Sequence, residues 1–297
     1  MGTKLLYPER VLKEYLRYNE LKMPETEHKI IIGNSTQMDE IKDKEIHLII
    51  TSPPYPMIEM WDDMFASLGC QTYDEMHNYL ADTWKECYRV LIDGGIACIN
   101  IGDATRKLNG TFKLFPNHSR IIEIFEKLGF DTLPYILWKK PTNKPNAFLG
   151  SGFIPNNAYV TLDCEYILLF RKNALRKFKP KDPYRYASHY TKEERDVWFS
   201  QIWNIRGIRQ ENSELSRRVG AYPEEVVYRL LRMFSIIGDT VLDPFLGTGT
   251  TTKIAMENNR NSIGYEIKED LVNLIKKKLD SENLYGKFFI RLRDDRI

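Results

Sequence analysis

The chain has 297 residues, 42% of them hydrophobic, and a formal net charge of +2 at neutral pH. That length accommodates one large α/β domain or two small ones, and so small a net charge identifies no class of partner. The four cysteines lack the C-x-x-C spacing of zinc sites, so we expect free thiols, no disulfide framework and no metal. The amino terminus has no signal-peptide h-region and no apolar run is long enough to span a membrane, so we expect a cytoplasmic protein.

Apolar periodicity divides the chain into helices and strands. Helical spacing, caps and glycine stops predict helices over residues 8–22, 34–41, 73–91, 116–128, 224–235, 251–259 and 271–279. Short β-branched runs predict strands over residues 29–33, 46–51, 96–102, 134–140, 164–172, 239–245 and 262–267. Strands that alternate with helices in this way predict a doubly wound, mostly parallel sheet that is covered on both faces.

A glycine-containing turn follows the strand that ends at Asp243 and directly precedes a helix. Gly247 and Gly249 permit close approach of the backbone to a ligand at the helix N-terminus. Glu266 ends the next strand, where its carboxylate can accept hydrogen bonds from both hydroxyls of a ribose. The arrangement predicts a site for a cofactor that contains a nucleoside.

This turn fits the two common phosphate-binding motifs poorly. Thr250 follows Gly249, so the G-K-[ST] of a P-loop is missing, and Thr252 replaces the third glycine of a dinucleotide fingerprint. A carboxylate at Asp243 repels a pyrophosphate but attracts an ammonium group. S-adenosylmethionine carries an ammonium group and no phosphate, so the turn favours that cofactor; an ordinary glycine turn without a ligand is the alternative.

The second motif is TSPPYP, residues 51–56, which follows the apolar strand IHLII. Two consecutive prolines fix the backbone and remove two N–H donors, so the carbonyl groups there remain available to accept hydrogen bonds. Such a site suits an amino group, and the ring of Tyr55 lies directly beside it in the sequence. A rigid Pro-Pro loop without chemical function is the alternative.

Together, TSPPYP and DPFLGTGTT resemble the motifs of the amino-methylating DNA methyltransferases. In that family the S/D/N-P-P-Y/F/W tetrapeptide is catalytic and the D-P-F-x-G-x-G run binds S-adenosylmethionine. The resemblance covers most of the chain, and further matching segments are IIGNS, WKECYRVLIDGG, ILWKKP, CEYILLFRK and AYPEEVVYRLLRMFSIIGDTVLDPF. Arg217 and Arg218 depart from the pattern, because many members carry a histidine in that region.

The resemblance implies a Rossmann-like class I methyltransferase, a single catalytic domain over residues 1–297. The sheet would have an antiparallel hairpin at one edge, and a small DNA-recognition insertion would be added to the domain. The catalytic residues that the resemblance implies are Ser52, Pro53, Pro54 and Tyr55. The cofactor-binding residues that it implies are Asn34, Pro223, Asp243, Pro244, Phe245, Gly247, Gly249, Thr250 and Glu266.

The catalytic motif precedes the cofactor motif, an order that resembles the permuted β class of the family. In that class the segment between the two motifs reads DNA, so we expect residues 141–163 and 172–202 to face DNA. The second of these is basic and rich in aromatic residues, although such a charge run is also typical of a solvated surface. The expected DNA-binding residues are Lys177, Lys179, Lys181, Arg185, Arg206 and Arg209. Asn143, Asn146, Asn156 and Asn157 are candidates for contacts with base edges.

The expected reaction is methyl transfer to an exocyclic amine of a base flipped out of double-stranded DNA. Ser52 favours cytosine N4 as the target, because S-P-P-Y is more frequent in cytosine enzymes of the family and D-P-P-Y in adenine N6 enzymes. Both amines require the same acceptors, so adenine N6 is the alternative. Cytosine C5 methylation is disfavoured, because that chemistry uses a cysteine that typically follows proline and the chain has no Pro-Cys pair.

Two alternatives belong to other classes. Protein and RNA methyltransferases with a similar tetrapeptide usually carry N-P-P-Y after the cofactor motif, the reverse of the order here. A non-catalytic nucleic-acid-binding relative should have lost a motif glycine or the Pro-Pro pair, and this chain retains them. We expect a monomer or homodimer that acts beside a cognate restriction endonuclease.

Overall fold

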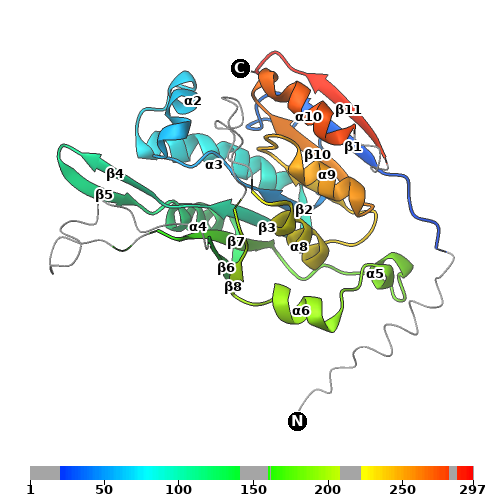
Figure 1. Cartoon of the computed structure of the whole chain (residues 1–297). Helices are drawn as coiled ribbons and strands as arrows, with labels where there is room; N and C mark the ends of the chain where they lie inside the picture. Colours follow the sequence, from blue (N-terminus) through cyan, green and yellow to red (C-terminus); the bar gives the residue numbers. More distant parts are fainter. Residues whose placement is uncertain (1–20, 141–159, 161, 208–221, 281–285, 297) are drawn as a thin grey trace, which may run out of the picture.

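The computed structural model describes residues 21–140, 160, 162–207, 222–280 and 286–296. Nine strands of these residues form one sheet, in the order β11-β1-β10-β9-β2-β3-β7-β6-β8 (Figure 1). In chain order these strands are β1 (Glu27–Ile32), β2 (Ile46–Thr51), β3 (Leu91–Ile101), β6 (Phe130–Lys139), β7 (Cys164–Lys172), β8 (Ile202–Asn204), β9 (Thr240–Asp243), β10 (Asn261–Glu266) and β11 (Lys287–Leu292).

The sheet is mostly parallel, as the sequence predicts. From β11 to β3 every neighbouring pair is parallel, whereas β7 runs antiparallel to both β3 and β6. The β6–β7 pair confirms the expected antiparallel hairpin, and β8 extends the sheet one strand beyond it. Strands β1, β2, β3, β9 and β10 therefore end together at one edge, here named the carboxyl edge, and begin at the opposite amino edge.

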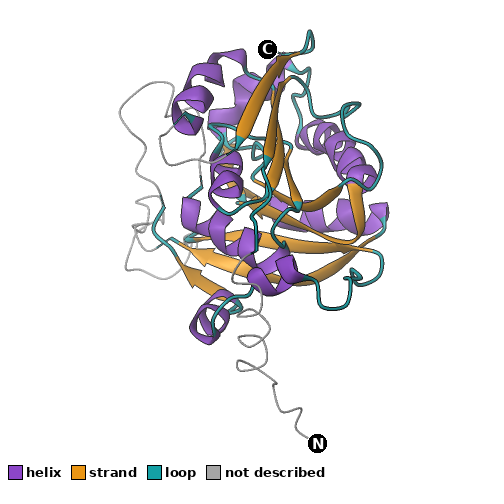
Figure 2. Cartoon of the chain, turned by 90° about the vertical axis from the view of Figure 1, so that its right-hand side faces the viewer, coloured by secondary structure: helices purple, strands orange, loops and turns teal. Residues whose placement is uncertain are grey.

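Helices cover both faces of the sheet (Figure 2). The helices on one face are α2 (Asp62–Ser67), α3 (Tyr73–Val90) and α4 (Asn117–Leu128), and those on the other are α8 (Glu224–Phe234), α9 (Thr250–Glu257) and α10 (Val272–Leu279). On the first face the buried ring of Phe125 lies 5.3 Å from Trp84 and stacks on Phe170 at 4.1 Å. On the second, Val227 and Leu231 of α8 belong to one apolar cluster with β2 and β9. Apolar burial on both faces fixes the helices, and the loops between them form the carboxyl edge.

Helix α3 shows how local sequence sets an element. The Thr72 hydroxyl accepts a hydrogen bond from the Glu75 backbone N–H, and the Glu75 carboxylate accepts one from the Thr72 N–H, which makes a capping box. The helix ends at Val90 because Leu91 is already extended. The predicted span of 73–91 is therefore confirmed within one residue.

The helix predicted over residues 34–41 is wrong, because this segment contains only turns and irregular backbone. Its backbone groups make one bond to each other, from the Ile41 N–H to the Met38 carbonyl, and several to side chains of α3. The Arg89 guanidinium donates to the carbonyls of Met38 and Ile41, and the Glu86 carboxylate accepts from the Met38 N–H. Tertiary hydrogen bonds thus replace the helical ones in a segment too short to hold a helix alone.

The structure also contains short elements that the sequence does not predict. They are the hairpin β4 (Ala104–Leu108) and β5 (Thr111–Phe115), the helices η1 (Glu59–Trp61), α2, α5 (Pro183–Ala187), α6 (Lys192–Trp198) and η2 (Glu269–Leu271), and the strands β8 and β11. Most are too short for a period to be recognised. The helix expected over 8–22 lies almost entirely outside the described residues. No helix of the described residues is both long enough and apolar enough to cross a membrane.

Candidate active site

The cofactor half of the site lies where β9 and β10 end. Gly247 and Gly249 have φ values of 57° and 88°, a left-handed conformation that favours glycine, and Gly249 caps the N-terminus of α9. The turn thereby brings the Gly247 N–H within 2.8 Å of Oε2 of Glu266, whose Oε1 accepts from the Lys268 N–H at 2.9 Å. Strand β10 and the glycine turn hold this carboxylate in one orientation.

Glu266 keeps capacity to bind a ligand. Each of its two oxygens has accepted one backbone N–H, which leaves further lone pairs for two hydroxyl donors. Burial raises the pKa of Glu266 to about 7, against the lowering effect of the hydrogen bonds from Lys268 and Gly247. A carboxylate at the end of β10 fits the hydroxyls of a ribose, so this observation supports a nucleoside-containing cofactor.

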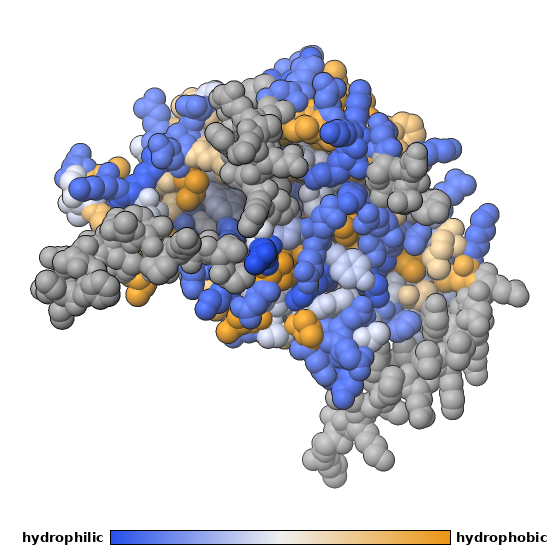
Figure 3. Space-filling view, in the orientation of Figure 1, coloured by the Kyte–Doolittle hydropathy of each residue, from blue (hydrophilic) through white to orange (hydrophobic). Residues whose placement is uncertain are grey.

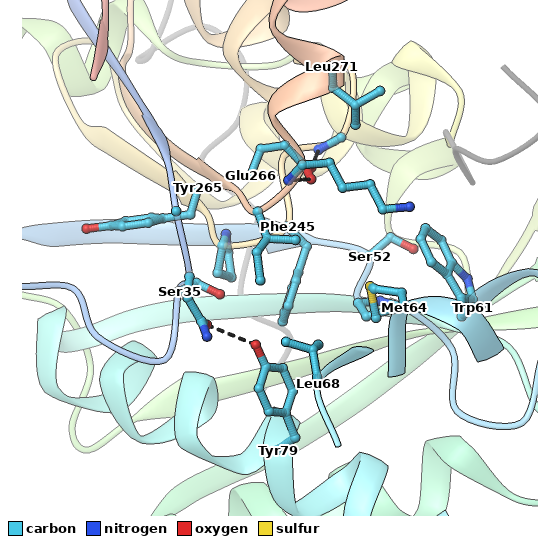
Figure 4. A pocket seen from close by; sticks show the side chains of 17 residues that line it. Ser35, Ser52, Trp61, Met64, Leu68, Tyr79, Phe245, Tyr265, Glu266 and Leu271 are labelled. Carbon is cyan, nitrogen blue, oxygen red and sulfur yellow. Dashed lines mark hydrogen bonds between the residues drawn. The ribbon is translucent and has the colours of Figure 1, made fainter. Parts of the chain in front are cut away.

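A pocket opens beside Glu266 (Figure 4). Glu266 and Leu271 lie on one side of it, Ser52, Met64 and Trp61 lie on the other, and Phe245 lies between them. Its lining residues are Gly33, Asn34, Ser35, Ser52, Pro54, Trp61, Met64, Leu68, Tyr79, Pro244, Phe245, Gly247, Tyr265, Glu266, Ile267, Lys268 and Leu271. The pocket therefore joins residues of both sequence motifs, which lie almost two hundred positions apart.

The expected cofactor residues divide into two groups. Asn34, Pro244, Phe245, Gly247 and Glu266 line this pocket. Within it, the Asn34 Oδ1 accepts the Tyr79 hydroxyl at 3.0 Å, which orients the side chain (Figure 4). The other expected residues, Asp243, Gly249, Thr250 and Pro223, support the loops around the pocket without lining it.

The expectation that Asp243 attracts an ammonium group needs correction. Its carboxylate is fully buried and accepts four protein hydrogen bonds, from the hydroxyls of Thr51, Thr251 and Tyr222 and from the Phe245 N–H. Those donors occupy its acceptor sites and shield its charge from the pocket. The Thr51 bond, 2.6 Å long, instead ties the end of β2 to the end of β9. Asp243 therefore fixes the catalytic motif relative to the cofactor pocket.

The catalytic tetrapeptide continues directly from Thr51. Ser52 and Pro54 line the cofactor pocket, while Tyr55 turns towards β3 and β7. The Tyr55 hydroxyl lies 3.1 Å from the Ser52 Oγ, donates to the Glu165 carboxylate at 3.0 Å and accepts from the Asn100 amide at 2.7 Å. Burial and the neighbouring Glu165 charge hold the pKa of Tyr55 well above its usual value, so it remains a neutral hydroxyl.

The surroundings of Tyr55 fix its ring as well as its hydroxyl. A side-chain carbon on Gly102 would come to 3.0 Å from the ring, so any other residue there would require the ring to shift by a few tenths of an ångström. The Asn117 amide donates to the carbonyls of Pro56 and Gly102, which joins the catalytic loop to the end of that strand. The aromatic ring is thus held rigidly beside Ser52, an arrangement suited to stacking a planar base.

The expected DNA-binding residues do not lie together. Arg176 forms a two-bonded ion pair with Asp239, which precedes β9, so the chain after β7 crosses the amino edge. Lys177, Lys179, Lys181 and Arg185 follow on this segment and on α5, and Figure 1 shows α5 across the molecule from α2, whose Met64 lines the pocket. The exposed Arg206 follows β8, which ends at the carboxyl edge. Arg209 and most of residues 141–163 lie outside the described residues.

A basic element does project from the carboxyl edge, the β4–β5 hairpin. It carries Arg106, Lys107 and Lys113 and no acidic residue, and its turn at Asn109 and Gly110 has positive φ at both positions. The Arg106 guanidinium donates to the Met57 carbonyl at 2.7 Å and pairs with Asp62, which fastens the hairpin to the chain just after the catalytic motif. In Figure 3 the surface at the left of the molecule, where the hairpin projects, is mostly hydrophilic.

Sequence reasoning misses several residues of the site. Glu165 and Asn100 contact Tyr55, and Thr51 and Tyr222 contact Asp243. Glu165 is the single acid in the otherwise apolar run CEYILLF, which is a signal that the sequence offers; the roles of the others depend on strand pairing. Among the described residues, no three His, Cys, Asp or Glu side chains are grouped so as to hold a metal ion.

Known proteins share this arrangement. Residues 46–277 match the DNA methylase family of N6 and N4 methyltransferases. The type II methyltransferase M.MjaI of Methanocaldococcus jannaschii is 63% identical over 277 residues, which cover 86% of this chain and 91% of that protein. M.MthZI of Methanothermobacter thermautotrophicus, also a type II methyltransferase, is 45% identical over 291 residues, 92% of this chain and 82% of the relative.

Solved structures agree with this assignment. The DNA modification methylase TTHA0409 of Thermus thermophilus, in complex with S-adenosyl-L-methionine, has a TM-score of 0.69 and 29% identity, and covers 90% of this chain and all of its own. PvuII DNA methyltransferase, described as cytosine-N4-specific, shares the fold, with a TM-score of 0.64 and 17% identity over 93% of this chain and 99% of its own. This chain therefore belongs to the N6/N4 DNA methylase family and is an S-adenosylmethionine-dependent DNA methyltransferase.

Proposed function

We propose that this enzyme methylates the exocyclic N4 amine of cytosine in a flipped-out base of double-stranded DNA. The observation that carries the proposal is the position of Ser52, which lines the cofactor pocket while its hydroxyl contacts Tyr55. A base stacked on Tyr55 would present its amine to the Ser52 Oγ and the Pro53 carbonyl. The same position would place the amine beside the cofactor pocket.

The residues of the site would act on the amine by accepting its two hydrogens. The amine nitrogen is a poor nucleophile because its lone pair is conjugated with the ring. Hydrogen bonds to Ser52 and Pro53 would favour a tetrahedral nitrogen, whose lone pair points into the pocket. Bound S-adenosylmethionine, held by Glu266 and the Gly247 turn, supplies the electrophilic methyl group. Stacking on Tyr55 would stabilise the extruded base by about 1–3 kcal/mol.

Separate observations support the choice of target base and the biological role of the enzyme. Ser52 in place of aspartate supports cytosine N4 over adenine N6, by resemblance to the cytosine enzymes of the family. The relatives M.MjaI and M.MthZI are named type II methyltransferases, which supports a role in a restriction-modification system with a cognate endonuclease. The position of TSPPYP ahead of the cofactor motif supports the permuted β class.

The proposed DNA surface is the carboxyl edge, with the β4–β5 hairpin and Arg206 as its described basic elements. A flipped base must enter from this edge, because Ser52 and Tyr55 lie there. Lys107 and Lys113 are exposed on the hairpin and would contact phosphates. Lys177, Lys179, Lys181 and Arg185 lie on the opposite side, so we no longer propose them as contacts for the DNA that enters the site.

Methylation of a plasmid followed by sequencing that resolves modified bases tests the proposal. We expect N4-methylcytosine at one recurrent sequence context. If N6-methyladenine is the only product, adenine N6 is the target and the cytosine proposal is wrong, while the mechanism of methyl transfer to an exocyclic amine still holds. Absence of S-adenosylmethionine binding at millimolar concentration in calorimetry would instead favour a nucleic-acid-binding protein without catalysis.

A further inference from the structure

The Tyr55 hydroxyl is the centre of a closed polar network. Ser52 Oγ, Asn100 Nδ2 and Glu165 Oε2 lie 3.1, 2.7 and 3.0 Å from it, and Asn100 Nδ2 also lies 2.8 Å from Glu165 Oε2. The Lys140 ammonium pairs with the other oxygen of Glu165. Apart from Ser52 these partners come from β3, β7 and the end of β6, so strand pairing alone brings them to the catalytic tetrapeptide.

The hydrogens in this network can be assigned by counting donors. Glu165, paired with Lys140, is a carboxylate and can only accept, so the single Tyr55 hydrogen is directed to it. The Asn100 N–H is a second donor to the Tyr55 oxygen. The contact between Tyr55 and Ser52 then has only one hydrogen available, that of Ser52. Ser52 must donate to Tyr55.

We propose that Glu165 is a positioning residue that fixes the direction of this network and thereby makes the Ser52 oxygen an obligatory acceptor towards the substrate. The inference rests on the proposed amino-methyl transfer. A serine hydroxyl by itself can donate or accept, whereas the aspartate found in other family tetrapeptides can only accept. With its hydrogen committed to Tyr55, Ser52 presents only lone pairs, as an aspartate would.

The direction of the hydrogen bonds in this network also determines which bases can bind in the site. An amine donates to both Ser52 and the Pro53 carbonyl, so cytosine satisfies the site. A uracil in the same position would place its carbonyl oxygen against two acceptors and leave the buried groups unpaired. Glu165 therefore contributes to selection of an amino group over a carbonyl group.

Asn100 provides independent support for a network ordered by Glu165. Its side chain is 3% exposed, and its Oδ1 has no hydrogen-bond partner among the described residues. The reverse orientation of the amide would bring Oδ1 against the Glu165 carboxylate, which repels it. Asn100 thus leaves an acceptor unsatisfied in order to direct both of its N–H bonds at Tyr55 and Glu165.

The substitution Glu165→Gln tests the proposal, because Lys140 can only donate and will select the orientation of the new amide. The glutamine oxygen should face Lys140 and its NH₂ group should face Tyr55 and Asn100, whose amide must then turn its Oδ1 towards the new donor. The Tyr55 hydrogen thereby loses its carboxylate acceptor, and Ser52 is no longer obliged to donate to Tyr55. We expect kcat to fall about 10- to 100-fold, with the dissociation constant of S-adenosylmethionine within twofold of wild type. Glu123→Gln on the exposed surface of α4 is the matched control and should leave kcat unchanged.

Ser52→Asp supplies a rescue that a merely structural role for Glu165 would not produce. In the double variant Ser52→Asp/Glu165→Gln, Tyr55 can donate to the new aspartate while the glutamine NH₂ donates to Tyr55. The aspartate still accepts from the amine. We expect kcat of the double variant to exceed that of Glu165→Gln at least about fivefold. Ser52→Asp alone, with two carboxylates competing for one Tyr55 hydrogen, should be slower than wild type.

A duplex with uracil at the target position supplies a binding readout. Wild type should bind it more weakly than the cytosine duplex, and Glu165→Gln should reduce that difference. A Glu165→Gln enzyme with wild-type kcat, or a double variant no faster than Glu165→Gln although folded and able to bind cofactor, would overturn the proposal. Failure of the wild-type enzyme to methylate any amine in DNA would overturn the proposed function instead, so the two failures are distinguishable.

Discussion

Asp243 and Glu266 end neighbouring strands, and their surroundings give them different roles. All the acceptor sites of Asp243 are taken by protein donors, and the residue connects the end of β2 to the end of β9. Glu266 accepts two backbone N–H groups and faces the pocket with further lone pairs free. The first carboxylate holds the site together, and the second is available to a ligand.

Replacement of Asp243 tests its structural role. In Asp243→Asn the new NH₂ group faces at least one donor, so a hydrogen bond from Thr51 or Thr251 is lost within the core. We expect the free energy of unfolding to fall by about 2 to 4 kcal/mol, measured by urea denaturation. Asp39→Asn, at an exposed position, is the control and should change it by less than about 0.5 kcal/mol. Unchanged stability of Asp243→Asn would contradict the role assigned here.

Glu266 should make cofactor affinity depend on pH. Burial raises its pKa to about 7, so in the free enzyme the carboxyl group is largely protonated below pH 7. Its contribution to stability is therefore present below the unfolded pKa and is lost as pH rises through 7. Ribose hydroxyls donate to the ionised form, so the affinity for S-adenosylmethionine should increase about tenfold between pH 6 and pH 8.

Calorimetry across that pH range measures the effect. Glu266→Gln, which cannot ionise, should bind the cofactor more weakly, and its remaining affinity should lose the part of the pH dependence that Glu266 causes. An identical pH profile for the wild-type and glutamine enzymes would show that another group is responsible.

At the scale of elements, the β4–β5 hairpin is the clearest addition to the sequence-based picture. It projects from the carboxyl edge, carries three basic residues and is fastened by Arg106 to the chain beside the catalytic motif. Leu108 and Leu114 are 42% and 43% exposed on it. Both features suit an element that lies against DNA.

Removal of the two exposed hairpin lysines should weaken DNA binding. For Lys107→Ala/Lys113→Ala we expect the KM for duplex DNA to rise about tenfold and the slope of log affinity against log salt to decrease by about 1 to 2. Affinity for S-adenosylmethionine should not change. Lys177→Ala/Lys179→Ala removes two lysines from the opposite side and is the matched control. A larger loss of DNA affinity in that control than in the hairpin variant would indicate that the segment after β7, and not the hairpin, contacts DNA.

At the scale of the whole molecule, the segment between β7 and β8 crosses the amino edge of the sheet. The Arg176–Asp239 pair joins this segment to the start of β9, and the Ser188 hydroxyl accepts from the Ile237 N–H at 2.8 Å. Asp239 is only 3% exposed, so its charge depends on its polar partners, and Arg176 supplies two hydrogen bonds beside the one from the Ile236 N–H. The contacts indicate that the segment stabilises the amino edge.

Loss of the Arg176 partner should destabilise the fold without impairing catalysis. Arg176→Ala leaves the buried Asp239 carboxylate with only the Ile236 N–H and the His47 ring as polar neighbours, so we expect the free energy of unfolding to fall by about 2 to 4 kcal/mol. At a temperature where the variant remains folded, kcat/KM should stay within about twofold of wild type. Lys85→Ala, in an exposed pair on α3, is the control and should cost less than about 1 kcal/mol. Selective loss of DNA affinity by Arg176→Ala would contradict this account.

The sequence by itself determines most strands of the sheet, its long flanking helices, the glycine turn after β9 and the Pro-Pro segment after β2. Those features depend on local periodicity and on glycine and proline at fixed positions, and both can be recognised in the sequence. Loops and short elements cannot be recognised from such patterns. The sequence of residues 34–41 predicts a helix, but side chains of α3 form hydrogen bonds with the backbone of this segment.

Tertiary structure alone decided three further points. Strand pairing placed Glu165 and Asn100 against Tyr55, across 110 and 45 positions of the sequence, respectively. The close contact of β2 and β9 turned Asp243 from a cofactor ligand into a buried connector. The direction of β7, antiparallel to its neighbours, carried the basic segment after it to the amino edge, whereas β3 ends at the carboxyl edge, where the β4–β5 hairpin follows it. A sequence records charge and spacing, but the side of the sheet on which a charge lies depends on which way each strand runs.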